Sequence, residues 1–295
     1  MKNLRVGGLV LALVMAGGLT AQTVDFVVVS KELSYNQTDN STATLATNPW
    51  SFRADIEGSS LSGIAMPTMS SAGGTGSVVM TYDASDGDWS VGSQFSSQAL
   101  LDAAYFSGNY GITVLSQSVS PISLTGDTYP TAPIATLSGG TIVNGVLTWN
   151  VSQALTITIS GTGIDHMGVY VFANGGGYDG GKDTFGVTSQ AFTVPAFSMT
   201  SGQNYTVELS FDDIVGGTNT TAFVGTGGMS ATQFAGVYTA QTKFTIQAVP
   251  EPGSYALICG IAVLIGMVVR SGWIGRGIDC RRGACRNAAH SLSRV

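Results

Sequence analysis

Apolar and polar residues alternate along much of the chain, and a period of two is the pattern of a β-strand with one buried face. The segment Trp50–Ile56, WSFRADI, shows this pattern clearly, since every second residue is apolar. Turn-forming residues separate such runs at intervals of about 8–12 residues, a spacing typical of β-sandwiches. The pattern predicts an all-β protein of one or two β-sandwich modules. The expected strands are 24–29, 50–56, 77–82, 110–115, 119–124, 146–149, 155–159, 169–172, 190–194, 205–211 and 244–246.

Other local patterns refine this prediction. Gln98–Tyr105 carries Leu100, Leu101 and Ala104 at helical spacing, so one helical turn is expected there. The polar segment Asn36–Asn48 is expected to be a loop. Two strand pairings are also expected from short connections: 110–115 with 119–124, and 146–149 with 155–159.

The strand pattern is interrupted at Tyr129–Pro133, where the sequence YPTAP favours an edge or a linker. We place a module boundary shortly after it, near residue 145. The expected modules are therefore residues 22–145 and residues 146–248.

The first 21 residues have the features of a secretory signal peptide. Lys2 and Arg5 precede the apolar run Val6–Met15, and the small residue Ala21 stands at the expected cleavage point. We expect cleavage after Ala21. The alternative is an uncleaved anchor, although the run is short compared with the ~20 residues that a membrane crossing needs.

A second apolar run, Tyr255–Val269, lies near the C-terminus. As a helix it is about 22 Å long, and a bilayer core is about 30 Å thick. Pro252–Ser254 and a snorkelling Arg270 would complete the crossing. A single transmembrane helix is expected, and the alternative is a buried helix of a soluble protein. Residues 271–295 form a basic tail, either a genuine cytoplasmic tail or an extended reading frame.

The segment Val249–Arg270, VPEPGSYALICGIAVLIGMVVR, combines a Pro-Glu-Pro box, an apolar run and an arginine. It resembles the PEP-CTERM sorting signal of exported bacterial proteins, which an intramembrane exosortase processes. The resemblance implies that Pro250, Glu251, Pro252 and Arg270 are the recognition residues and that an exosortase-type enzyme and a membrane are partners. The prolines hold the box extended, as a processing enzyme requires. The chain departs from the family by continuing for 25 residues after Arg270.

Parts of the body also resemble the ectodomains of PEP-CTERM proteins. These parts are LLDAAYFSGNYGITV, SLTGDTYPTAPIATLSGGTIVNGVLTW and NYTVELSFDDIV. The resemblance implies jelly-roll or immunoglobulin-like modules, and it carries no known active site.

Charge is distributed unevenly along the chain. Only 10% of the residues are charged, and between Gln22 and Pro250 there are 16 acidic residues against four basic ones. Such an acidic body argues against nucleic-acid binding. Six arginines and one aspartate follow from Arg270 onward, which fits the cytoplasmic side of a membrane. All three cysteines lie beyond the body, so no disulfide is expected in it.

Two turns are candidates for Ca²⁺ binding because each groups carboxylates. One holds Asp83, Asp86 and Asp88, and the other holds Asp179 and Asp183. The alternative is that aspartate is simply a good turn former. No metal or cofactor is predicted.

Catalytic motifs are scarce. His166 lies beside Asp165, but no G-x-S-x-G or HExxH motif occurs, so we expect His166 to be a loop residue without a catalytic role. Gly175–Gly180 matches G-x-G-x-x-G, yet Lys182–Val187 does not look like the helix that a nucleotide site needs, and a flexible loop is the better interpretation.

A carbohydrate-directed role stays open. Sixteen body acids leave a glycosidase pair conceivable, but nothing singles one out. Trp50, Trp89, Trp149 and Tyr178 are candidates for a sugar-stacking face, or for core packing.

The sequence therefore predicts an exported, non-catalytic surface or extracellular-matrix protein. It is expected to be anchored in the inner membrane with its body outside the cytoplasm and to be processed at the box, which would release it to the cell surface or matrix. The alternative is a secreted carbohydrate-binding or carbohydrate-active protein with the same anchor, and extracellular polysaccharide is a candidate partner.

Overall fold

The structure is a computed structural model that describes residues 23–59, 61–71, 76–84, 87–114, 117–118, 121–173, 178–216 and 233–251, together with Ile261, Val263, Ile265 and Met267. The predicted signal peptide, most of the predicted transmembrane helix and the basic tail lie outside these residues. Ile261, Val263, Ile265 and Met267 are helical and exposed.

The described chain is mostly β-structure, as the alternation predicts. A ten-stranded sheet has the order β15-β14-β17-β18-β1-β2-β6-β5, and β12 joins it beside β18 with β11 next to β12. Its strands are β1 (Thr23–Gln37), β2 (Ala43–Ser59), β5 (Thr81–Asp83), β6 (Asp88–Phe95), β11 (Ile142–Val143), β12 (Val146–Asn150), β14 (His166–Ala173), β15 (Asp179–Phe185), β17 (Asn204–Ile214) and β18 (Gln233–Val249).

Two smaller sheets cover the large one. One consists of β10 (Thr136–Leu137), β13 (Leu155–Ser160) and β16 (Ser189–Val194). The other consists of β3 (Thr68–Ser70), β4 (Ser77–Val79), β7 (Gly108–Val114), β8 (Gln117–Ser118) and β9 (Ile122–Leu124). A 3-10 turn spans Leu61–Gly63, and the predicted helical turn is α1 (Gln98–Ala104), which Ser97 caps by accepting a hydrogen bond from the Leu100 N–H.

Each small sheet encloses a separate apolar core. The first core draws on residues between Val24 and Leu124 and adds Tyr238 of β18. The second draws on residues between Ala135 and Ala248. The predicted linker Tyr129–Pro133 carries no strand and lies between the two sets, whereas the predicted boundary at residue 145 stays a prediction.

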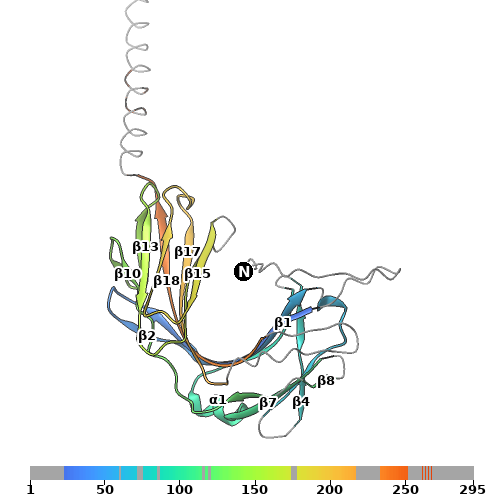
Figure 1. Cartoon of the computed structure of the whole chain (residues 1–295). Helices are drawn as coiled ribbons and strands as arrows, with labels where there is room; N and C mark the ends of the chain where they lie inside the picture. The colour runs from blue at the N-terminus through green and yellow to red at the C-terminus, as the bar shows by residue number, and fades with distance from the viewer. Residues whose placement is uncertain are drawn as a thin grey trace, which may run out of the picture.

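Both cores lie on the same side of the large sheet. On β18, the buried Tyr238 packs in the first core, and Phe244, Ile246 and Ala248 pack in the second. These residues are an even number of positions apart, so they share one face of the strand. Figure 1 shows the result: the large sheet bends, with β10 and β13 beside one arm and β4, β7 and β8 beneath the other, all on the outer side of the bend.

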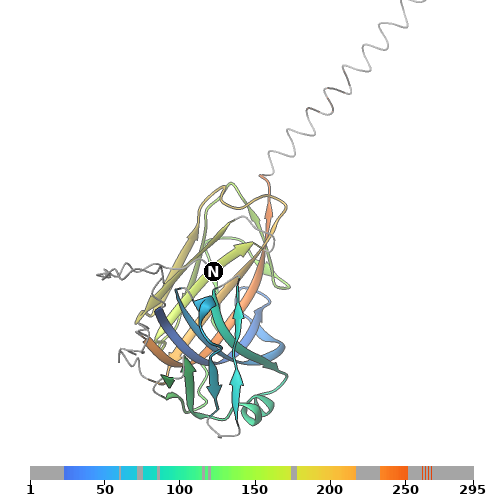
Figure 2. The same cartoon turned by 90° about the vertical axis from the view of Figure 1, so that its right-hand side faces the viewer.

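The centre of the large sheet joins the two ends of the described body. β1 pairs in parallel with β18 from Phe26 opposite Gln233 to Asn36 opposite Lys243. β2 flanks β1 on its other side, and β17 flanks β18. In Figure 2 the blue N-terminal strands and the orange β18 accordingly run side by side. β18 is long enough to pair with β12 beyond the end of β1, and it therefore contributes to both cores.

Three sequence-based expectations about strands were wrong. The expected strand 77–82 is divided into β4 and β5, which belong to different sheets. Segment 146–149 does not pair with 155–159, because β12 belongs to the large sheet and β13 to the small sheet across the second core. Both strands have one buried face, and that pattern is equally typical of strands in two facing sheets and of strands paired within one sheet. The segment Asn36–Asn48 is mostly strand, since β1 continues to Gln37 and β2 starts at Ala43. The predicted pairing of 110–115 with 119–124 is confirmed by β7 and β9.

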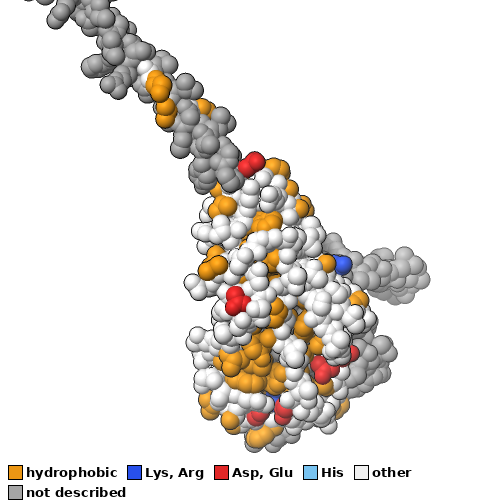
Figure 3. Space-filling view, turned by 90° about the vertical axis from the view of Figure 1, so that its left-hand side faces the viewer, with side chains coloured by type: hydrophobic (Ala, Val, Ile, Leu, Met, Phe, Trp, Pro, Cys, Tyr) orange, Lys and Arg blue, Asp and Glu red, His pale blue; other side chains and the backbone are white. Residues whose placement is uncertain are grey.

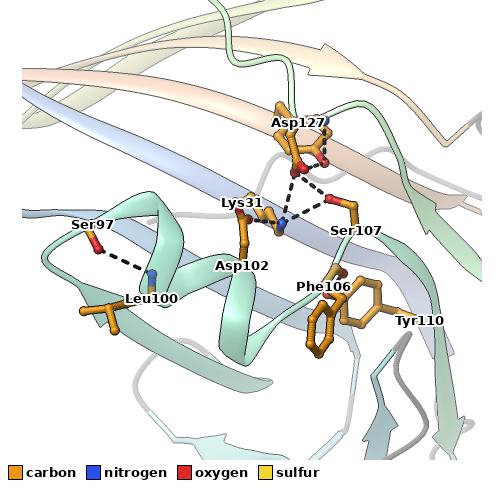
Figure 4. A network of polar contacts seen from close by, with 9 residues as sticks. Lys31, Ser97, Leu100, Asp102, Phe106, Ser107, Tyr110 and Asp127 are labelled. Atoms are coloured by element: carbon orange, nitrogen blue, oxygen red, sulfur yellow. Dashed lines mark hydrogen bonds and ion pairs between the residues drawn. The ribbon is translucent and has the colours of Figure 1, made fainter.

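A buried lysine ties the first core together. Lys31 of β1 is 0% exposed and faces the core. Its Nζ donates to Asp102 Oδ1 of α1 at 2.6 Å, to Asp127 Oδ1 at 3.1 Å and to Ser107 Oγ at 3.3 Å, as Figure 4 shows. The Tyr238 hydroxyl donates to Asp127 Oδ1 at 2.9 Å. One ammonium therefore connects a central strand, the helix and the segment after β9.

Gly236 permits a close approach between two layers. A Cβ at this position of β18 would lie 2.1 Å from the carbonyl oxygen of Ser123 in β9. Because the obstacle is backbone, β9 would have to move away from the large sheet.

We predict that Lys31→Met lowers the free energy of unfolding by about 3 kcal/mol, because Asp102 and Asp127 lose their counter-charge. Urea denaturation measures the change. The control is Lys182→Met at an exposed position, with an expected change within about 0.5 kcal/mol. Equal stability of the two variants would contradict the assigned role of Lys31. The triple variant with Asp102→Asn and Asp127→Asn should recover part of the loss.

Gly236→Ala is expected to destabilise the protein by about 1–3 kcal/mol, because the added methyl group overpacks the contact with β9. Gly139→Ala is the matched control, since its Cβ would meet Trp149 at an ordinary 3.4 Å. Thermal unfolding of both variants tests the prediction, which fails if Gly236→Ala has the same melting temperature as the wild type.

Candidate functional site

The predicted sorting box begins where the central strand ends. β18 extends to Val249, and Pro250 follows it directly. Proline has no N–H to continue the ladder, so it is a suitable terminator. Glu251 is exposed. Pro252 and Arg270 lie outside the described residues, and among the described residues no helix has the length and hydropathy of a membrane span.

The first candidate calcium turn is the connection between β5 and β6. Asp83 pairs with Asp88 across that hairpin, and Asp86 lies outside the described residues. The buried Asp88 directs Oδ2 toward Arg53 Nη2 at 3.7 Å. Within the described ranges, no group of three acidic, histidine or cysteine side chains is arranged to hold a metal ion.

Trp89 and Trp149 are core residues and offer no sugar-stacking surface. Trp89 and Trp149 are each 7% exposed, and each donates its indole N–H to a backbone carbonyl, of Leu61 and Gln153 respectively. Trp50 packs edge-on against Tyr129 at 5.1 Å between ring centroids. Core packing is thus the better interpretation for Trp89 and Trp149.

The most organised polar surface lies on the side of the large sheet opposite both cores. We call it the polar face. Strand register aligns its side chains in rows, and one row crosses five strands through His166, Asp212, Thr239, Glu32 and Ser51. The full set is Gly181 and Asp183 of β15, His166, Gly168 and Tyr170 of β14, Glu208, Ser210 and Asp212 of β17, Thr239, Gln241 and Lys243 of β18, Ser30 and Glu32 of β1, and Ser51, Arg53 and Asp55 of β2.

His166 was expected in a loop, but it is the first residue of β14. Its Nδ1 lies 2.5 Å from Asp212 Oδ2 and its Nε2 lies 3.1 Å from Asp183 Oδ1. Thr239 and Tyr170 extend the chain of hydrogen bonds, donating to Asp212 and Asp183 respectively. His166 therefore sits between two carboxylates that belong to the two neighbouring strands.

The carboxylates determine the charge of His166. Burial alone lowers the pKa of the imidazole, but the hydrogen bonds and charges of Asp183 and Asp212 outweigh burial and raise the pKa to about 9. Burial likewise opposes ionisation of Asp183, yet bonds from His166 and Tyr170 hold its pKa below the usual value. At neutral pH the imidazole is cationic, so it has no free lone pair with which to act as a general base.

The rest of the polar face is also internally paired. Lys243 Nζ lies 3.1 Å from Glu208 Oε2, and the Gln241 amide donates to Glu208 Oε1 at 2.7 Å. Ser51 donates to Glu32 at 3.1 Å. Burial raises the pKa of Glu32 in spite of that bond and of the nearby Arg53 charge.

Arg53 and Asp55 form the opposite end of the polar face. Arg53 Nε donates to Asp55 Oδ1 at 2.7 Å. Burial is the main influence on Asp55 and raises its pKa to about 6, with Arg53 acting in the other direction. Cations and carboxylates thus lie side by side at three places on the polar face, and these pairs stabilise the arrangement of its side chains.

Tyr170 lies in a space that two glycines leave open. A Cβ on Gly181 would be 2.3 Å from Tyr170 Cδ1, and a Cβ on Gly168 would be 2.9 Å from Tyr170 Cε2. These atoms belong to opposite edges of the ring. Since both edges lie close to the sheet, the ring lies flat on it.

The polar face is not apparent from the sequence alone. Its members come from six strands, and no spacing along the chain brings them together. One signal was available: in strands such as 205–211, YTVELSF, the polar positions alternate with apolar ones, which marks an organised second face.

Comparisons with known proteins do not assign a function to this chain. No family model matches the chain, and no curated protein matches it. Among solved structures, the human OSCAR ligand-binding domain aligns at 12% identity and TM-score 0.20 over 61% of this chain and 89% of that one. A bacterial ice-binding adhesin aligns at 13% identity and TM-score 0.25 over 77% and 66%. A two-domain fibronectin type III segment of chicken tenascin aligns at 12% identity and TM-score 0.21 over 70% and 97%. TM-scores this low do not carry a function from those proteins to this chain.

The histidine predicts a pH dependence of stability. Its folded-state pKa is raised above the unfolded value of 6.5, so its contribution is fully present below pH 6.5 and is lost as pH rises through about 9. We expect the stability advantage of the wild type over His166→Gln to shrink by about 1–3 kcal/mol between pH 6.5 and pH 9.5. Urea denaturation across this range measures it, and a constant difference would contradict the pairing with Asp183 and Asp212.

Proposed function

We propose that this chain is an exported, non-catalytic surface or extracellular-matrix protein. Its β-sheet body lies outside the cytoplasm, the segment Val249–Arg270 anchors it in a membrane, and an exosortase-type enzyme processes it at Pro250–Pro252. The observation that carries the proposal is the junction at the end of β18. The box follows the sheet without an intervening linker, and Glu251 is exposed there.

The position of the box at that junction fits a sorting signal that is separate from the folded body. A residue that belongs to the core would be buried, whereas Pro250 and Glu251 lie beyond the last ladder pair, Asn150 with Val249, and Glu251 is exposed. An enzyme working beside a membrane can reach such a strip while the body remains folded. The acidic body and the arginine-rich tail support the same orientation across the membrane.

The polar face supports the non-catalytic part of the proposal. His166, the histidine of the body, is held as a cation between Asp183 and Asp212. The neighbouring hydroxyls of Tyr170 and Thr239 donate to those same carboxylates. These groups stabilise one another, and none of the bonds activates a nucleophile.

The processing step is testable by mass. In a host that carries an exosortase, the mature protein should lack at least residues 271–295, and Glu251→Gln or Pro252→Ala should retain them. Asp179→Asn, at an exposed position of the body, is the control and should be processed as the wild type is. Intact-protein mass spectrometry gives the result. Recovery of mature wild-type protein with the tail still attached would refute processing at the box.

A further inference from the structure

We propose that the polar face binds a neutral saccharide and that the ring of Tyr170 is its stacking platform. The proposal goes beyond the anchoring function and does not rest on it, because it concerns only the body.

The position of the Tyr170 ring leaves one of its two sides available for a ligand. Gly181 lies opposite Tyr170 on β15, and Gly168 lies two residues before it on β14, so all three share the polar face. One edge of the ring lies where a side chain on Gly181 would begin, and the other edge lies where a side chain on Gly168 would begin. One side of the ring therefore contacts the sheet, and the other side points away from it. The Tyr170 side chain is half-buried, as expected for a ring with one covered side.

The ring is also fixed in place before any ligand arrives. Its hydroxyl donates to Asp183 Oδ1, and the same oxygen lies 3.1 Å from His166 Nε2. His166 is held in turn by Asp212 at 2.5 Å. A platform locked in this way loses little conformational entropy on binding, which favours affinity for a weakly interacting ligand.

Hydrogen-bonding groups surround the platform at accessible positions. Asp183 is 42% exposed and Lys243 is 44% exposed, and they lie on opposite sides of Tyr170 with Glu208 between Tyr170 and Lys243 in the register. Adjacent strands are about 4.8 Å apart, so these groups recur at intervals comparable to the width of a sugar ring. Phe185 adds a second exposed aromatic ring, 4.5 Å from the His166 ring and 68% exposed.

The charge and polarity of the face select the ligand class. On the polar face, five carboxylates outnumber three cations, so an anionic polymer or a nucleic acid would be repelled. The carboxylates are Asp183, Asp212, Glu208, Glu32 and Asp55, and the cations are His166, Lys243 and Arg53. An apolar partner would leave the charged groups without water. A neutral saccharide avoids both costs, because its C–H face packs on an aromatic ring while its hydroxyl groups donate to carboxylates and accept from an ammonium.

The alternative is that Tyr170 only fills the space above two strand glycines. Binding distinguishes the two. The full chain, purified in detergent, is titrated calorimetrically with neutral gluco-, manno- and galacto-hexasaccharides, and with a hexamer of uronic acid as the charged comparison. We expect the wild type to bind at least one neutral hexasaccharide and to bind the uronate at least tenfold more weakly.

Variants then locate the site. Tyr170→Ala should weaken binding about tenfold, and Tyr170→Phe, which keeps the ring, should change it less than about threefold. Phe197→Ala removes an aromatic side chain that is 75% exposed elsewhere and should leave affinity unchanged. Near-ultraviolet circular dichroism verifies folding. If Tyr170→Ala does not fold, Lys243→Gln tests the same face from its exposed rim and should weaken binding at least threefold.

Three outcomes would overturn the proposal: no neutral hexasaccharide binds the folded wild type at millimolar concentration, binding is indifferent to both Tyr170→Ala and Lys243→Gln, or the uronate binds best. Because none of these measurements involves the sorting box, their failure would leave the processing proposal standing, and failure of processing would leave saccharide binding standing.

Discussion

The charge of Lys31, buried in the middle of the large sheet, is the constraint on which the first half of the structure depends. An ammonium without water needs anions and hydrogen-bond acceptors around it. Asp102, Asp127 and Ser107 meet that need only if α1 and the segment after β9 pack against β1. Tyr238 binds Asp127 as well, so β18 must also be in place. The lysine thus specifies one arrangement of four elements that apolar packing alone would leave less defined.

The large sheet uses its two faces for different purposes. The outer side of the bend is apolar and holds both cores, while the opposite side carries the polar face. On that polar face the charges are matched locally, with His166 between two aspartates and Lys243 beside Glu208. Figure 3 shows that charged side chains are also few on the surface that it presents. A protein so constructed is hydrated mainly by hydroxyl and amide groups, and its few charges are used in specific pairs.

The local patterns predicted strands well and their partners poorly. Alternation located β2 and β17, and helical spacing located α1, because burial on one face imposes those periods. Alternation cannot say whether 146–149 lies beside 155–159 or across a core from it. The pairing of β1 with β18 joins segments far apart in sequence, and no short-range signal encodes it.

Lys31 itself gave a usable signal, since it occupies a core-facing position in the run FVVVSKEL, but only the fold reveals which acids meet it. The His166 site was missed for the same reason, as its partners Asp183 and Asp212 come from two other strands.

The pairing of β1 with β18 has a consequence for the order in which the chain folds. Synthesis proceeds from the N-terminus, so the strand that carries Lys31 is made first and its neighbour is made last. Until β18 exists, the long edge of β1 is open and Asp127 lacks the Tyr238 hydroxyl. The pairing of β1 with β18 therefore comes late, and it carries the entropic cost of bringing together two segments far apart in sequence. A chain cut short before Gln233 would lack β18 and leave this edge of β1 unpaired, and such an edge is prone to pairing with another chain.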